Sequence, residues 1–202
     1  MKTVRKGLLV FAAVLALNAS GASAQVAWDS PFLMPPRPTP GLGVFLMDVA
    51  GGDIGAMFTW QPTARSLGFR LGIAEQRDDD IAIFGGADVS GAITRATRDF
   101  PLDVDWVFGI GGSIGDDFLL SVPAGISLGH TFPAEGARFT PYLTPRVVLD
   151  AWFGDDAPGD DDDVSLDLAV DIGLDLQFQG NWKIRFGGTI GDRDAVAIGI
   201  VF

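Results

Sequence analysis

The sequence of 202 residues contains no cysteine, one histidine and one tyrosine. The missing thiols exclude a disulfide framework, a thiolate metal site, an iron–sulfur cluster and a cysteine nucleophile. Basic residues are also scarce, with 14 Lys and Arg against 26 Asp and Glu, so the net charge is −12. Because phosphate backbones are bound by basic surfaces, we expect no nucleic-acid partner. With 48% hydrophobic residues, the chain is too apolar to be a disordered acidic tail.

The first 24 residues have the features of a secretory signal peptide. Three basic residues precede an apolar run from Gly7 to Leu17, and Ala22-Ser23-Ala24 is a small-x-small cleavage site. The apolar run is shorter than the roughly 20 residues that a membrane-spanning helix needs, which disfavours an uncleaved anchor. We therefore predict that residues 1–24 are a cleaved signal peptide and that the mature chain is exported.

Residues 25–41 include a proline-rich stretch with the sequence PFLMPPRPTP. Proline has no backbone N–H, so this stretch is unsuited to a helix interior or a central strand. We predict an extended periplasmic arm that acts as a spacer before the first strand. A docking peptide or a partial plug is the alternative.

From residue 42 onward, apolar residues recur at every second position. Between Val164 and Phe178, eight apolar side chains alternate with seven small or polar ones, which places the apolar set on one face of a strand. Most such segments approach the about 9 to 11 residues of a tilted membrane strand, and short connections make neighbours antiparallel. The ten segments are 42–50, 53–62, 66–75, 80–93, 102–114, 117–130, 139–153, 163–178, 182–191 and 194–202.

The second face of these segments is rich in Gly, Ala, Ser and Asp. A soluble sandwich would carry more Lys, Glu and Thr on its wet face, whereas small residues suit the narrow interior of a barrel. The sequence therefore predicts an all-β fold over residues 42–202: a closed, antiparallel, up-and-down transmembrane β-barrel with short loops. Its apolar face meets lipid, and closure leaves no unpaired edge there. About ten strands are expected, with eight or twelve as alternatives.

The chain ends in an alternating segment, Ala195 to Phe202, whose last residue is aromatic, and Thr140-Pro141-Tyr142 opens an earlier strand. With the signal peptide and the alternating strands, these features resemble the bacterial outer-membrane β-barrel class. The resemblance implies Sec-type export, integral location in the outer membrane, and contact with membrane lipid and lipopolysaccharide. It also implies insertion by the barrel-assembly machinery, with Phe202 as the assembly signal. The oligomeric state stays open.

The distribution of charge supports ten strands. If both ends of the mature chain lie at one end of the barrel, the odd-to-even connections share the other end, where they carry 14 acids and two arginines. The remaining turns carry Arg65, Arg95, Arg98 and Arg138 against two acids. If one strand had been missed or wrongly added in the middle of the chain, the acidic and the basic connections would no longer lie at separate ends of the barrel.

Charged residues on the small-residue face are expected in the lumen, where they need oppositely charged partners. The predicted ion-pair network consists of Arg70, Asp103, Asp105, Arg146, Asp150, Asp167, Asp171, Asp175, Lys183 and Arg185. Asp48 and Asp88 are expected to face inward as well. We favour a network that fills a narrow barrel over a selective path for small ions, although Asp rings favour cations. At about ten strands, any pore would be small.

Two acidic loops offer hard oxygen ligands for Ca²⁺ or Mg²⁺. The candidate ligands are Asp78, Asp79, Asp80, Asp155, Asp156, Asp160, Asp161, Asp162 and Asp163. Their spacing lacks the register of a calcium-binding loop, so at most weak cation binding is expected, and no other cofactor. Otherwise these loops are solvated tips of an acidic extracellular surface.

The leading interpretation is a non-enzymatic outer-membrane barrel, structural or weakly conducting for small ions. The alternative is a surface binding module whose Asp-rich loops engage divalent cations, lipopolysaccharide or a protein partner. A hydrolase is disfavoured because His130 and Ser127, three residues apart, lie on opposite faces of a strand. Pro123, Pro141 and Pro145 fall within predicted strands, so we expect bulges there or a later start to the seventh strand.

Overall fold

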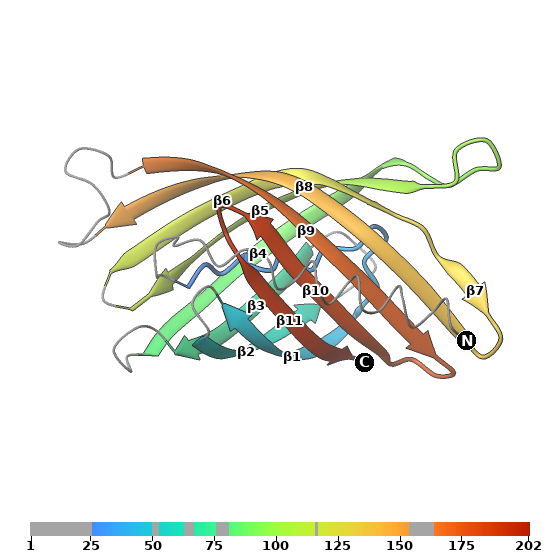
Figure 1. Cartoon of the computed structure of the whole chain (residues 1–202), viewed down its shortest axis with the longest axis horizontal. Helices are drawn as coiled ribbons and strands as arrows, with labels where there is room; N and C mark the ends of the chain where they lie inside the picture. Colours follow the sequence, from blue (N-terminus) through green and yellow to red (C-terminus); the bar gives the residue numbers. More distant parts are fainter. Residues whose placement is uncertain (1–25, 50–52, 63–66, 76–80, 116, 154–163) are drawn as a thin grey trace, which may run out of the picture.

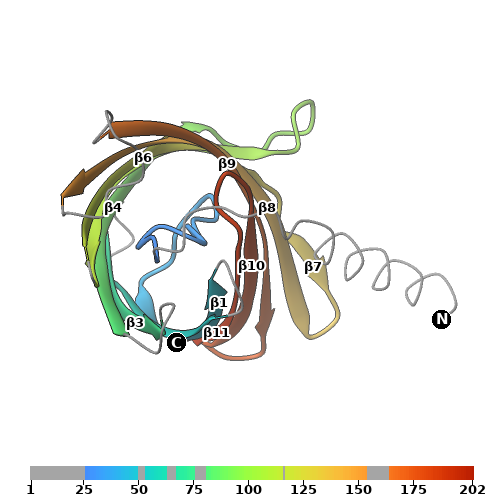
Figure 2. The same cartoon turned by 60° about the vertical axis from the view of Figure 1, so that its left-hand side comes forward.

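The computed structural model describes residues 26–49, 53–62, 67–75, 81–115, 117–153 and 164–202. Ten long strands form a ring around a central lumen, as Figures 1 and 2 show. The ten are β1 (Gly41–Val49), β2 (Asp53–Gln61), β3 (Leu67–Glu75), β4 (Ile81–Thr94), β5 (Asp103–Ile114), β6 (Phe118–Gly129), β8 (Ala137–Phe153), β9 (Val164–Phe178), β10 (Lys183–Gly191) and β11 (Ala195–Val201). A short β7 (Phe132–Ala134) forms a hairpin with the start of β8 beside the ring.

The barrel is closed by antiparallel pairing all the way round. The ends of the sheet meet where β1 pairs with β11, and Leu42 and Phe202 exchange backbone hydrogen bonds of 2.7 and 2.8 Å. The β6–β8 pairing passes over β7 and completes the ring. The predicted all-β, up-and-down barrel with about ten strands is confirmed. Among the described residues, no helix is long and apolar enough to cross a membrane.

The prolines are accommodated differently from the prediction. Pro141 and Pro145 lie inside β8, which begins at Ala137, so the expected later start is wrong. No register shift occurs at Pro123 or Pro145 either: the β5–β6 and β6–β8 ladders each skip two residue pairs there and resume in the same register. A local gap is sufficient because proline removes one donor without changing the length of its strand. The register shift in β4 falls elsewhere, between Ala92 and Thr94.

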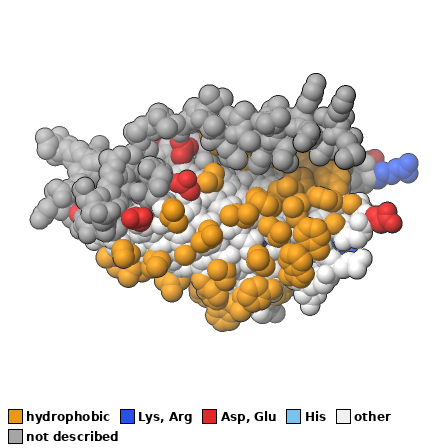
Figure 3. Space-filling model, turned by 60° about the horizontal axis from the view of Figure 1, so that its bottom comes forward, with side chains coloured by type: hydrophobic (Ala, Val, Ile, Leu, Met, Phe, Trp, Pro, Cys, Tyr) orange, Lys and Arg blue, Asp and Glu red, His pale blue; other side chains and the backbone are white. Residues whose placement is uncertain are grey.

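The two faces of the wall are sharply different. In β3, exposed and buried residues alternate at every position, and the outward Leu71 is 60% exposed. Figure 3 shows hydrophobic side chains spread over one side of the outer wall. Aromatic pairs flank this apolar surface, with the stacked Trp60–Phe69 at one end and the tilted Phe118–Phe153 at the other, as aromatic girdles do at membrane interfaces. The outer face is therefore suited to lipid, whereas Arg70, the polar residue in the middle of β3, is enclosed.

Residues 26–40 run inside the barrel, and we call this segment the plug (Figure 2). Its residues from Val26 to Pro36 are buried. This position contradicts the predicted periplasmic arm and agrees with the alternative of a plug. The prolines of the plug lack backbone N–H groups, so they leave no buried donor without a partner. Their carbonyl oxygens and those of their neighbours can be buried because side chains of the wall donate hydrogen bonds to the plug.

Candidate functional site: the plugged lumen

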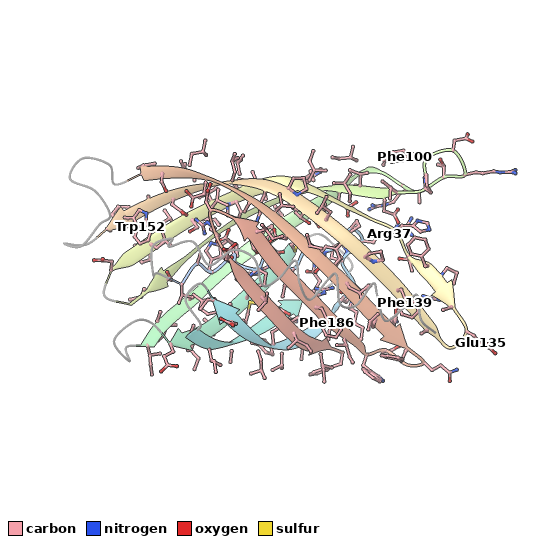
Figure 4. The ribbon with its side chains drawn as sticks, in the orientation of Figure 1. Arg37, Phe100, Glu135, Phe139, Trp152 and Phe186 are labelled. Atoms are coloured by element: carbon pink, nitrogen blue, oxygen red, sulfur yellow. The ribbon has the colours of Figure 1, made fainter. Side chains whose placement is uncertain are left out.

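The plug spans the lumen from one end of the barrel to the other. The connections that follow β1, β3, β5, β8 and β10 share one end, which we call the acidic end. Ala27 packs there with Leu119 and Trp152, whereas Arg37 lies toward the opposite end (Figure 4). The chain then enters β1 at Gly41, beside Phe202.

Trp28 and Phe32 are the apolar anchors of the plug. Their side chains are 1% and 0% exposed, and their rings meet edge-on with centroids 6.0 Å apart. Glycines of the wall make room for Trp28, since a Cβ on Gly86 or Gly111 would lie 2.3 or 2.6 Å from its ring. Part of the small-residue face of the barrel is therefore shaped to this side chain.

Backbone carbonyls of the plug accept hydrogen bonds from side chains of the wall. Arg70 Nη2 donates to the carbonyl of Phe32 at 2.8 Å, and Arg185 Nη1 donates to that of Leu33 at 3.0 Å. Ser127 Oγ donates to the carbonyl of Met34 at 2.6 Å. These bonds replace the hydrogen bonds to water that the buried carbonyl oxygens lose.

Asp29 connects the plug electrostatically to the wall. The residue is fully buried, with Oδ1 at 2.7 Å from Arg193 Nη1 and Oδ2 bonded to Arg146 Nη1. Arg146 also binds Asp171 at 2.7 Å. Burial alone would raise the pKa of the Asp29 carboxyl, but the charges of Arg193 and Arg146 hold it below its ordinary value.

Arginines also contact the aromatic anchors. The guanidinium of Arg70 lies 4.8 Å from the ring centroid of Phe32 and 5.3 Å from that of Trp28, and it pairs with Asp88 at 3.0 Å. Arg146 lies 5.4 Å from the Phe32 ring. Because these cations are desolvated, such contacts contribute more than they would at the surface.

A second group of ion pairs surrounds the part of the plug nearest β1. Asp175 binds Lys183 at 2.9 Å and Arg185 at 2.6 Å, and Lys183 Nζ donates to Thr39 Oγ1 at 2.8 Å. Arg37 of the plug binds Asp103 at 3.0 Å. Asp105, beside it on the same strand, binds Arg95.

Each of the ten residues predicted to form the lumen network has an oppositely charged partner in the structure. Asp88 also faces inward, but Asp48 does not. In β1 the buried phase carries Phe45 and Met47. Both faces of β1 therefore carry apolar residues. The alternating pattern alone does not show which face points inward, and Asp48 was assigned to the wrong face.

Two central members of the network were absent from the sequence prediction. Asp29 was missed because its segment was placed outside the barrel, and Arg193 because it was assigned to an outer loop. Arg193 instead extends inward to Asp29 and to the wall residues Asp150 and Asp167. The detectable signal was the presence of Trp28 and Phe32, since large apolar side chains are unexpected in a solvated spacer.

The other candidate sites either fall on residues that the structure does not describe or are not assembled in it. The acidic loop positions 78–80, 155–156 and 160–163 lie outside the described residues, so their predicted cation binding stays a prediction. In the part of the chain that is described, no cluster of three acids or histidines could hold a metal ion. Ser127 is bonded to the plug, whereas His130 packs against Phe132 with ring centroids 4.6 Å apart.

Comparisons with known proteins give no family for this chain. No protein-family model and no curated protein matches the sequence. Among solved structures, a chain described as "De novo design of transmembrane beta-barrels" is similar at 14% identity, with a TM-score of 0.36, over 83% of this chain and 98% of that chain. A "KdgM porin" is similar at 9% identity, with a TM-score of 0.35, over 80% and 98%. The functional argument therefore depends on the lumen itself.

Proposed function

We propose that this chain is an integral outer-membrane β-barrel whose lumen is closed by its own N-terminal segment. Its role is structural, and it conducts small ions weakly at most. The observation that carries this proposal is the buried plug, which occupies the path that ions would take through the barrel. The apolar outer wall supports location in a membrane.

The chemistry of the lumen favours a closed state. A ten-stranded barrel has a narrow interior, and Trp28 and Phe32 add two large aromatic side chains to it. Beside the plug, between Leu33 and Arg70, a cavity of about 40 Å³ has room for little more than a water molecule. Charged side chains that could attract ions are instead bonded to one another and to the plug.

Conductance in planar bilayers tests this proposal with the full-length protein. We expect wild type to be nearly silent over a wide range of salt, and a Trp28→Ala/Asp29→Ala double variant to give clear current steps. Arg37→Ala is the matched control, because its side chain is 59% exposed and should not hold the plug. Mobility on an unheated gel verifies that each variant is folded. Large steady currents from wild type, equal to those of the double variant, would contradict closure by the plug.

Three further expectations belong to the same proposal. Outer-membrane lipid and lipopolysaccharide would surround the apolar wall, and the barrel-assembly machinery would recognise the terminal strand, where the Phe202 side chain is 56% exposed. The extracellular surface would be acidic.

The alternative of a surface binding module depends on the acidic loops, and calorimetric titration of the folded protein with Ca²⁺ tests it. An absence of heat would end that alternative.

A further inference from the structure

The wall and the plug have complementary hydrogen-bonding capacities. Residues 31–40 include five prolines, so the plug has more backbone acceptors than donors. The wall presents arginine and hydroxyl donors at the matching positions. Carbonyls that accept from the wall belong to Asp29, Pro31, Phe32, Leu33 and Met34.

Specific side chains of the plug are also recognised. A Cβ on Gly187 would lie 2.2 Å from Leu33 Cδ2, and a Cβ on Gly129 would lie 2.9 Å from Pro36 Cγ. Together with the glycine pocket for Trp28, these positions fix the register of the segment in the lumen. The lumen therefore contacts both the backbone and the side chains of a peptide segment that turns at residues 27–30.

We propose that the lumen is a peptide-binding site for proline-rich segments that carry a Trp-Asp pair near their start, and that residues 26–40 occupy it as an intramolecular ligand. This inference rests on the proposed function, in which the plug closes the barrel. The contacts described above run from Ala27 to Thr39, so the covalent link to β1 makes none of them. The link raises the effective concentration of the plug, which reaches the millimolar range for short tethers. A separate peptide can therefore occupy the lumen once the resident segment is weakened.

The full-length Trp28→Ala/Asp29→Ala variant provides the test, because its own plug is weakened while the wall is unchanged. A synthetic peptide with the wild-type sequence of residues 26–40 is added in planar bilayers, on each side in turn. We expect it to block the current of the variant in a concentration-dependent way. The matched control peptide carries the same two alanines and should need at least a tenfold higher concentration for the same block.

The outcomes separate the two proposals. Block by the wild-type peptide, with the control at least tenfold weaker, supports the peptide site. Current through the variant that neither peptide blocks, at up to about 1 mM, overturns the peptide site and leaves closure by the plug intact. Silence of the folded double variant contradicts closure by the plug and removes the basis of the peptide site. If the double variant does not fold, the milder Trp28→Ala/Asp29→Asn variant takes its place, and the same three outcomes apply.

Discussion

Arg193 Nη1 lies 2.7 Å from Asp29 Oδ1, although the two residues are 164 positions apart in the sequence. Asp29 belongs to the plug, whereas Arg193 belongs to the connection between the last two strands. The same guanidinium binds Asp150 of β8 and Asp167 of β9. One side chain from the acidic end therefore joins the plug to two strands of the wall.

The first prediction concerns the loss of this carboxylate. Asp29→Ala leaves Arg146 and Arg193 buried with fewer partners, and breaking a buried ion pair costs about 3–5 kcal/mol. Because each arginine keeps a wall carboxylate, we expect the lower value, about 3 kcal/mol. Urea unfolding in lipid vesicles measures the free energy of unfolding.

The control for this experiment is the other charged residue of the plug. Arg37 pairs with Asp103, but its side chain is 59% exposed, so Arg37→Ala should cost less than about 1 kcal/mol. Equal losses for the two variants would show that Asp29 has no special role.

The second prediction concerns the glycine pocket of Trp28. An alanine Cβ at position 86 would lie 2.3 Å from Trp28 Cε3, so the rigid ring must move. We expect Gly86→Ala to destabilise the protein by about 1–3 kcal/mol through overpacking. It should also increase the conductance. Unfolding in vesicles and bilayer currents provide the two measurements.

Gly85, the adjacent residue on β4, provides the matched control. A Cβ there would meet the Arg70 carbonyl and the flexible Leu71 side chain at 3.2 Å, away from the plug. Gly85→Ala should therefore leave the conductance at the wild-type level. If Trp28 is the cause of the Gly86→Ala defect, that defect should shrink in a Trp28→Ala background, because contacting residues are not additive. An unchanged defect would contradict this explanation.

The barrel was readable from the sequence because a period of two needs only local information. In β9, apolar and small or polar residues alternate without interruption, so both the strand and its outward face could be predicted. The lumen positions of Asp171 and Asp175 follow from the same pattern. Where both faces of a strand are apolar, as in β1, the pattern does not show which face points inward, and there Asp48 was misplaced.

The plug could not be predicted in the same way, because nothing in its local pattern specifies where it lies. Proline argues against a strand, but it does not separate a solvated spacer from a segment enclosed by donors. The decisive contacts join Asp29 to residues 117 and 164 positions away. The buried role of Arg193 likewise depends on the plug, since without Asp29 it resembles any other charged residue in a loop.

The third prediction tests which solvent the outer wall meets. Leu71 lies in the middle of β3 and is 60% exposed. If the wall faces acyl chains, Leu71→Arg costs about 2–4 kcal/mol near the membrane midplane. The same change at Ile93, which lies four residues beyond the last β4 residue paired with β3, should cost about 0–1 kcal/mol. A neutral effect at both positions would indicate water around the barrel.

The fourth prediction concerns pH and the charge of Asp29, which lies on the plug and not on a membrane-spanning strand. Arg193 and Arg146, with a smaller contribution from Arg70, hold its pKa below the ordinary value of 3.8 despite burial. A carboxyl whose pKa is lower in the folded state stabilises that state fully above its unfolded pKa. The stabilisation is lost as the pH falls through the folded pKa.

The stability difference between wild type and Asp29→Asn isolates this effect, because the other carboxylates titrate in both proteins. The difference should be constant from about pH 7 to pH 5 and should shrink only below about pH 4. Unfolding in vesicles at a series of pH values measures it. A difference that instead grows in favour of wild type as the pH falls from about 7 to about 5 would mean that the pKa of Asp29 is raised. The desolvation of its carboxylate would then outweigh the two arginines, and protonation, instead of ion pairing, would keep the plug in the lumen.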